Sequence, residues 1–154
     1  MADRIFDHEQ LDVYRLAIEY VGETFRIAEK LSGLHRHSRD QWLRAAQSIP
    51  LNIAEGNGKR SPKDRARFFD IARGSALECS AIQDVLLVSE AITTETTQPM
   101  KAKLKRIVAM LTRLAMRSDE VAESPAWYNT DNEHDYEHDY EHEHEHEHRC
   151  AEHE

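Results

Sequence analysis

The sequence predicts an all-α fold, an antiparallel up-and-down four-helix bundle, and three observations support this prediction. Between residues 6 and 122, apolar residues recur at intervals of three and four, which is the period of an amphipathic helix. No segment there alternates apolar and polar residues as a half-buried strand would. Short breaks rich in Gly, Ser, Pro or Thr divide the pattern into four parts, and short connections favour antiparallel neighbours.

The first predicted helix covers residues 9–31, and Gly33 supplies its stop. One apolar row runs along it at alternating three- and four-residue spacing, so we expect this row to face the core. Its members are Leu11, Tyr14, Ile18, Val21, Phe25 and Ala28.

The second predicted helix runs from Ser38 to Glu55. Ser38 followed three residues later by Gln41 has the spacing of a capping box. Pro50 has no backbone N–H and its ring crowds the preceding turn, so we expect a kink there. An apolar row is predicted to face the core: Trp42, Ala45, Ile49 and Ile53.

The third predicted helix runs from Pro62 to about Glu90, with Ser61 as its N-cap. Gly74 in its middle suggests a close approach to a neighbouring helix, because glycine is otherwise unfavourable there. Residues 85–88 are apolar on more than one face. This indicates burial against another subunit or a broad core within the chain.

A loop of threonines, residues 93–97, is predicted to precede the fourth helix, which ends near Val121. Its core row is Met100, Leu104, Ile107, Leu111 and Leu114. We therefore expect a four-helix-bundle domain over residues 1–123 and a separate tail over residues 124–154.

The tail differs in composition from the rest of the chain. Residues 127–154 hold 11 of the 29 acidic residues and one of the 20 basic ones, a net charge of −10, whereas the remaining residues have a net charge of +1. Low hydrophobicity and high charge predict disorder. Alternating imidazoles and carboxylates can bind transition metals, although a solvated tail without metal is the simpler interpretation. The candidate ligands are His134, His138, His142, His144, His146 and His148.

The remaining composition indicates a cytoplasmic protein without a cofactor. Two cysteines, Cys79 and Cys150, do not make a disulfide framework, and we expect Cys79 to be a small buried residue. No apolar run approaches the roughly 18 residues of a membrane span, and the N-terminus has no signal-peptide pattern.

Polar residues interrupt the apolar patterns of the second and third helices. Ser75 and Glu78 fall in a row with apolar residues, so we expect Glu78 to be buried and paired with Arg44 or Asn52. The predicted structural polar cluster is Arg44, Ser48, Asn52, Glu55, Ser75 and Glu78.

The segments QWLRAAQSIPLNIAEG (residues 41–56) and FFDIARGSALE (residues 68–78) carry a family resemblance. Together they resemble the four-helix-bundle family of proteins encoded by intervening sequences of 23S ribosomal RNA genes. The accessory variability determinant of diversity-generating retroelements is similar. The resemblance implies a homo-oligomeric ring, typically a pentamer, with no established catalytic activity. Matching motif positions are Arg44, Ser48, Asn52, Glu55, Gly56, Gly74, Ser75 and Glu78.

The charge distribution favours non-specific nucleic-acid binding as the function. Residues 36–67 carry eight bases and three acids, and residues 101–117 carry six bases and no acid. Such segregation suits a polyanion, and a ring would repeat each weak phosphate contact. The candidate residues are Arg36, Arg39, Lys59, Arg60, Lys63, Arg65, Arg67, Lys101, Lys105, Arg106, Arg113 and Arg117, with Lys103 beside them.

Two other functions remain open at this point. The first is a protein-interaction scaffold that binds no nucleic acid. The second is an enzyme or metal-storage bundle, which we do not expect, because the predicted bundle has no Glu-x-x-His motif and its only histidines, His8, His35 and His37, fall in no helix core row. Glu55 and Glu78 as paired catalytic carboxylates are a weaker interpretation than a structural polar cluster.

Overall fold

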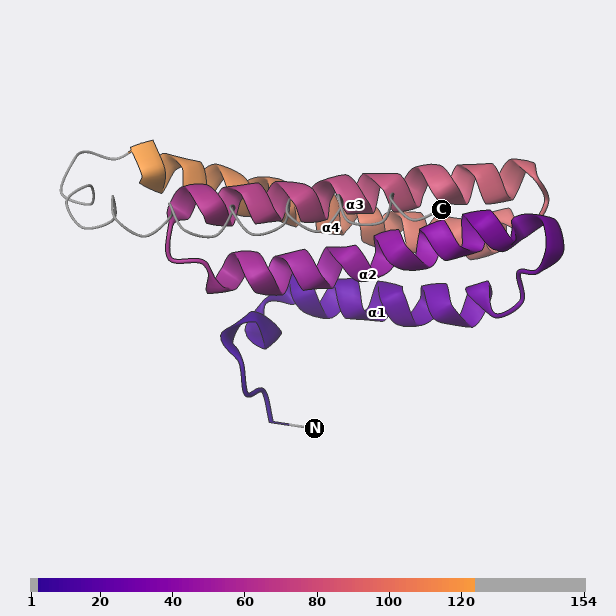
Figure 1. Ribbon diagram of the computed structural model, residues 1–154, viewed down its shortest axis with the longest axis horizontal. Helices are drawn as coiled ribbons and strands as arrows, with labels where there is room; N and C mark the ends of the chain where they lie inside the picture. Colours follow the sequence, from indigo (N-terminus) through magenta and orange to yellow (C-terminus); the bar gives the residue numbers. More distant parts are fainter. Residues whose placement is uncertain (1–2, 124–154) are drawn as a thin grey trace, which may run out of the picture. The chain divides into compact units, whose positions relative to one another are not determined.

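The computed structural model describes residues 3–123, and the predictions for residues 124–154 lie outside this part of the chain. Four α-helices follow one another in it: α1 (Asp12–Ala28), α2 (Arg36–Gly58), α3 (Pro62–Val88) and α4 (Thr94–Glu123). They lie alongside one another, with the connections at alternating ends (Figure 1). Two short 3-10 helices, Asp7–Gln10 and Gly33–His35, precede α1 and α2. Residues 3–123 contain no strand, so the predicted all-α class is confirmed for them.

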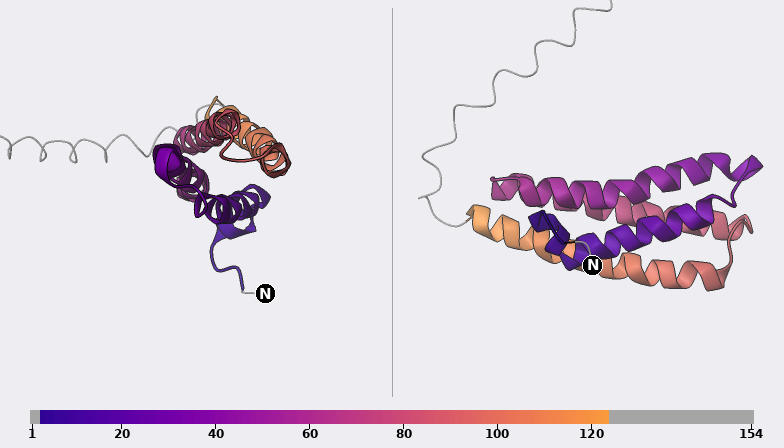
Figure 2. Two further views of the ribbon diagram at one scale, coloured as in Figure 1. Left: turned by 90° about the vertical axis from the view of Figure 1, so that its right-hand side faces the viewer. Right: turned by 90° about the horizontal axis from the view of Figure 1, so that it is seen from below.

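Each helix packs on the next one along the chain, and α1 also packs on α4, which closes the bundle (Figure 2). The largest fully buried side chains are Trp42, Tyr20, Phe69, Ile49 and Ile53. The predicted core rows of α2 and α4 are confirmed, except that Leu114 is only half-buried. None of the described helices is long and apolar enough to span a membrane.

The predicted core row of α1 is wrong in part: Ala28 is buried, and Leu11, Tyr14 and Val21 pack against the core while only half-buried, but two residues are exposed. Ile18 is 46% exposed and Phe25 is 43% exposed. The buried row is instead Val13, Leu16, Ala17, Tyr20, Thr24 and Ala28. Both rows have three- and four-residue spacing, so α1 is apolar on two faces. Spacing alone cannot decide which face packs on the other helices.

The predicted start of the second helix is also wrong, since α2 begins at Arg36 and has no side-chain cap. The 3-10 helix Gly33–His35 leads directly into it, so Ser38 already lies inside the helix. α2 continues through the buried Pro50 to Gly58.

The predicted start of α3 is confirmed, whereas the predicted start of α4 is not. Ser61 caps α3 as predicted, accepting a hydrogen bond from the Asp64 backbone N–H at 3.4 Å, and Pro62 is the first residue. The predicted threonine loop is wrong, because α4 already begins at Thr94. The Thr93 hydroxyl accepts from the Thr96 N–H at 3.3 Å and so takes the role of a cap.

The close helix approach lies at Gly56 and not at Gly74, where it was predicted. A β-carbon built at Gly56 would be 2.9 Å from the Phe68 Cβ and 3.2 Å from the Phe69 ring. A β-carbon at Gly74 would meet nothing within 4 Å. The absent side chain of Gly56 is thus what lets the end of α2 pack on the start of α3.

Candidate nucleic-acid interface

Two of the six basic residues at positions 101–117 are neutralised by neighbouring helices. Lys101 of α4 forms an ion pair with Asp84 of α3. Lys103 pairs with Glu23 and lies 3.6 Å from Glu19, both on α1. The hydrogen bond with Glu23 raises the pKa of Lys103. These two lysines tie α4 to its neighbours and are poor candidates for phosphate contacts.

The other four basic residues of this segment are exposed and take part in no ion pair within the described residues: Lys105, Arg106, Arg113 and Arg117. The three arginines are seven and four residues apart, so they lie on one face of α4, at rises of about 10 and 6 Å along it. Arg113 donates one hydrogen bond, from its Nε to the Ala109 carbonyl at 3.3 Å. We call Arg106, Arg113 and Arg117 the α4 arginine row.

The basic residues around the α2–α3 connection have acidic neighbours. Lys59 lies 3.8 Å from Glu55, and the Lys59 Nζ and the Arg67 Cζ each lie 4.9 Å from the centre of the Phe68 ring. A hollow of about 570 Å³ beside them is lined by two bases and three acids: Lys63, Arg67, Asp64, Asp70 and Asp119. The electrostatic potential around the α2–α3 connection is therefore neither strongly positive nor strongly negative. Arg60 is exposed and Arg65 is half-buried.

Arg36 and Arg39 lie at the other end of α2. Arg39 contacts Asp40 at 2.8 Å and donates to the Leu31 carbonyl at 3.2 Å. The candidate residues thus fall near both ends of α2 and along α4, and only the α4 arginine row lacks acidic partners as a group among the described residues.

The predicted polar cluster forms only in part. The Ser48 and Ser75 hydroxyls are 2.9 Å apart, and the Asn52 Nδ2 donates to the Ser48 carbonyl at 2.8 Å and to its hydroxyl at 3.0 Å. Ser75 also donates to the Ile71 carbonyl at 3.1 Å. The Ser48–Ser75 bond joins the middle of α2 to the middle of α3, and the other bonds hold its two hydroxyls within their own helices.

The predicted burial of Glu78 is wrong. Glu78 is exposed and accepts from the Gln41 amide at 3.3 Å, Arg44 is exposed, and Glu55 pairs with Lys59. The buried residues of α3 include Phe69, Ala72, Ser75, Ala76 and Cys79, so Ser75 faces the core as predicted, whereas Glu78 lies beside the buried face. Neither carboxylate is placed in a buried site.

A buried polar chain that the sequence did not reveal crosses the core from α2 through α1 to α3. The Trp42 Nε1 donates to the Tyr20 hydroxyl at 3.0 Å, and that hydroxyl donates to the Gln83 Oε1 at 2.8 Å. Burial raises the pKa of Tyr20, and burial also raises the pKa of the Cys79 thiol to about 12. The Gln83 Nε2 has no hydrogen-bond partner among the described residues. The one sequence signal was Trp42, which is predicted to face the core and whose indole N–H needs an acceptor when it is buried.

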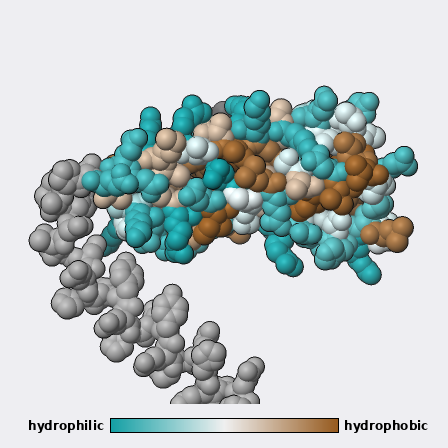
Figure 3. All heavy atoms as spheres, turned by 90° about the horizontal axis from the view of Figure 1, so that it is seen from above, coloured by the Kyte–Doolittle hydropathy of each residue, from teal (hydrophilic) through white to brown (hydrophobic). Residues whose placement is uncertain are grey.

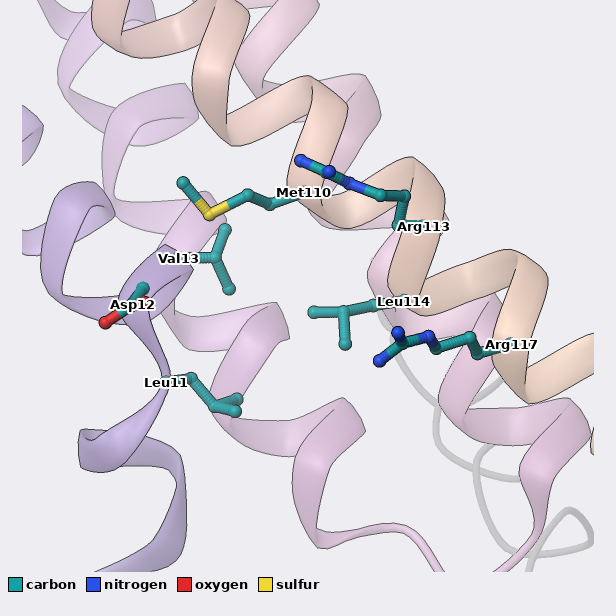
Figure 4. A pocket seen from close by; sticks show the side chains of 7 residues that line it. All are labelled: Leu11, Asp12, Val13, Met110, Arg113, Leu114 and Arg117. Atoms are coloured by element: carbon teal, nitrogen blue, oxygen red, sulfur yellow. The ribbon is translucent and has the colours of Figure 1, made fainter.

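A pocket of about 280 Å³ lies where the start of α1 meets the second half of α4 (Figure 4). Its lining combines aliphatic and charged side chains: Leu11, Asp12, Val13, Met110, Leu114, Arg113 and Arg117. Figure 4 shows Val13 of α1 and Leu114 of α4 extending toward each other across the pocket, with the Arg117 guanidinium beside Leu114. We call this the α1–α4 pocket.

One known protein family matches most of the chain. The family model described as 23S rRNA-intervening sequence protein matches residues 9–113. The chain belongs to this family. A search of curated proteins found no match.

A solved structure of the same kind supports the fold. It is the crystal structure of a protein of unknown function from the S23 ribosomal protein family of Bacteroides thetaiotaomicron. The sequence identity is 23% and the TM-score is 0.63, and the match covers 67% of this chain and 97% of that one. At this identity the similarity concerns the fold alone.

In this member of the 23S rRNA-intervening sequence protein family, several residues of the two motif segments lie where α2 packs on α3. The Ser48–Ser75 hydrogen bond joins α2 to α3, Asn52 supports Ser48 from the next turn of α2, and Gly56 permits the close packing of the two helices. These positions therefore hold the bundle together. The residues that distinguish a candidate nucleic-acid surface, the α4 arginine row, lie outside both motif segments.

Proposed function

We propose that this protein binds nucleic acid, RNA or DNA, without sequence preference, and that the α4 arginine row contacts the phosphates. The observation that carries the proposal is a face with three exposed guanidiniums and no ion pair among the described residues, in a segment with no acid. Guanidinium groups match phosphate oxygens in geometry and stay charged at any physiological pH.

The row favours contacts to the backbone of a nucleic acid over reading of its bases. Arginines at intervals along one helix face can follow a line of phosphates, but phosphate contacts carry no sequence information. Binding of this kind depends on charge and shape alone, so the proposed function involves neither catalysis nor a cofactor. It suits a protein of the cytoplasm, where structured RNA is abundant.

A substitution series tests this role. We expect Arg106→Gln, Arg113→Gln and Arg117→Gln together to weaken binding of a labelled RNA by roughly tenfold or more at low salt, measured by fluorescence anisotropy, because fewer phosphates are neutralised and fewer counterions are released. Lys101→Gln is the matched control, since Lys101 lies on the same helix but is neutralised by Asp84. An equal weakening in the triple variant and the control would contradict the proposal.

We also propose that the chain assembles with copies of itself, which would repeat the arginine row. Large apolar side chains are exposed on each of the four helices, and six of them lie on α1 and α3: Ile18, Phe25, Ile71, Leu77, Val85 and Val88. Hydrophobic side chains gather over one face of the molecule in Figure 3. Patches of this kind mark surfaces that are covered in an assembly. A pentameric ring, typical of the proteins that this chain resembles, is the assembly we propose.

The assembly is tested by mass measurement in solution. We expect Phe25→Glu and Val85→Glu each to reduce the oligomer mass, because a charge in an apolar interface is left without a partner. Leu34→Glu is the control, because Leu34 is 97% exposed in the connection before α2. An oligomer unchanged in both variants would place the interface elsewhere.

The second candidate function is a scaffold that presents an apolar face to another protein. The same exposed side chains of α1 and α3 favour it. The scaffold function would be supported over nucleic-acid binding by three results together. The chain would stay monomeric, would bind neither RNA nor DNA at low salt, and would bind one partner protein through Phe25 or Val85.

A further inference from the structure

The α1–α4 pocket has an apolar lining and a positive rim. Leu11, Val13, Met110 and Leu114 form its aliphatic part. Of the three charged residues, Asp12 is already neutralised by an ion pair with Arg15. The guanidiniums of Arg113 and Arg117 have no acidic partner among the described residues. The pocket therefore attracts a ligand with an anionic group attached to a less polar body.

The size of the pocket limits what that body can be. A volume of about 280 Å³ is near the lower edge of the roughly 300–1,000 Å³ that is usual for small-molecule sites. A single base with its sugar is of this order, whereas a peptide helix or a stacked duplex end is too large.

The charges beyond the pocket indicate a polymer. Arg106 continues the line of Arg113 along α4, at a rise of about 10 Å. A single small acid would leave Arg106 without a role, whereas a strand carries further phosphates at intervals. The arginine row and the pocket together suit a chain of anions with flat, partly apolar side groups.

We infer that the α1–α4 pocket holds one unpaired nucleotide of a nucleic-acid strand. Its base and sugar cover the aliphatic lining, and its phosphate lies between Arg113 and Arg117. The inference rests on the proposed function and narrows it to strands with unpaired bases. Bases in a duplex are stacked on one another and cannot enter, whereas unpaired bases can be turned out and stacked on guanidinium planes or apolar side chains.

The test compares a 20-nucleotide single strand with a 10-base-pair duplex of about equal phosphate number, both bound to the full chain. We expect the single strand to bind roughly fivefold or more tightly, because an unpaired base covers apolar surface that a duplex leaves exposed to water. Leu114→Gln should reduce this preference to about onefold and leave duplex binding unchanged. Met116→Gln is the matched control, because Met116 is exposed on the same helix but does not line the pocket.

The outcomes separate the inference from the proposed function. No binding of either nucleic acid would refute both. Binding of both with equal affinity, or an equal weakening in Leu114→Gln and Met116→Gln, would refute the pocket inference and leave the proposed function standing. If Leu114→Gln loses its helical circular dichroism, Met110→Gln replaces it, since Met110 is the other half-buried aliphatic lining residue of α4.

A small-molecule titration gives an independent readout. We expect adenosine monophosphate to shift the amide signals of Val13 and Leu114 in a saturable manner, and inorganic phosphate to leave them in place. Hexanoate tests for a simple fatty-acid site. Saturable shifts with hexanoate and none with adenosine monophosphate would overturn the inference.

Discussion

Gly56 of α2 faces Phe68 of α3 so closely that a β-carbon at position 56 would lie 2.9 Å from the Phe68 Cβ. Both β-carbons are fixed to the backbone and cannot move aside by a change of rotamer. We therefore expect Gly56→Ala to lower the free energy of unfolding by about 1–3 kcal/mol, the usual cost of overpacking. Urea unfolding measures this, and an unchanged midpoint would contradict the close approach.

For an alanine at Gly74 we predict the opposite change in stability. It lies in the interior of α3, and a β-carbon there would meet no atom within 4 Å. Alanine restricts the unfolded chain and favours the helix, so Gly74→Ala should raise the free energy of unfolding by about 1 kcal/mol. The same urea experiment serves as the check. Destabilisation would mean that another chain packs closely on this position.

The buried chain of Trp42, Tyr20 and Gln83 should be energetically coupled. Tyr20→Phe removes the acceptor of the Trp42 N–H and the donor to Gln83, so we expect the free energy of unfolding to fall by about 1–3 kcal/mol. The decrease should be smaller in a Gln83→Leu background, where no carbonyl is left without a donor. Additive decreases in the double variant would show that the two side chains act independently.

The Cys79 thiol should be inert in the folded protein. Burial raises its pKa to about 12 from an ordinary value of 9.0, which disfavours the reactive thiolate. In a Cys150→Ser variant, we expect iodoacetamide at pH 8 to modify Cys79 only after unfolding, as measured by mass spectrometry. Rapid modification without denaturant would contradict its burial.

The same shift has a consequence for stability at alkaline pH. Because the folded pKa is raised, the folded state keeps a proton that the unfolded state loses above pH 9.0. The contribution of Cys79 is complete below this pH and decreases as the pH rises toward the folded pKa. A Cys79→Ala variant should therefore lose less stability between about pH 9 and 11 than the parent chain. Equal losses in the two proteins, measured by urea unfolding, would contradict the raised pKa.

Metal uptake tests the prediction for the C-terminal histidines. Residues 3–123 contain no group of three or more His, Cys, Asp or Glu side chains placed to hold a metal ion. Removing residues 125–154 should therefore abolish zinc uptake, measured by calorimetry, without changing the helicity of the bundle. Unchanged uptake by the shortened chain would rule out the histidines of residues 134–148 as the ligands.

The sequence predicted the number and order of the helices well, because periodicity, Ser61-Pro62 and the glycine breaks are local signals. It failed where two alternatives satisfy the same local rule. On α1 and α3 two adjacent rows have helical spacing, and only the packing of the whole bundle decides that Tyr20 and Phe69 are buried while Phe25 and Glu78 are exposed.

The candidate nucleic-acid interface could also be predicted from the sequence only in part. The charge run of residues 101–117 was visible in the sequence, but the ion pairs that neutralise Lys101 and Lys103 come from α3 and α1, distant in the chain. The α1–α4 pocket could not be predicted, since only the tertiary fold brings Leu11 and Leu114 to the same pocket.

The most direct test of the central claim is the salt dependence of RNA binding by the full chain and by the variant in which all three arginines of the α4 row are replaced. If the row binds phosphates, the logarithm of the binding constant falls linearly with the logarithm of the salt concentration. The slope of the variant is then smaller by roughly 0.7–0.9 for each phosphate that the row no longer neutralises. The same slope for both proteins, or binding that does not depend on salt, would contradict the account.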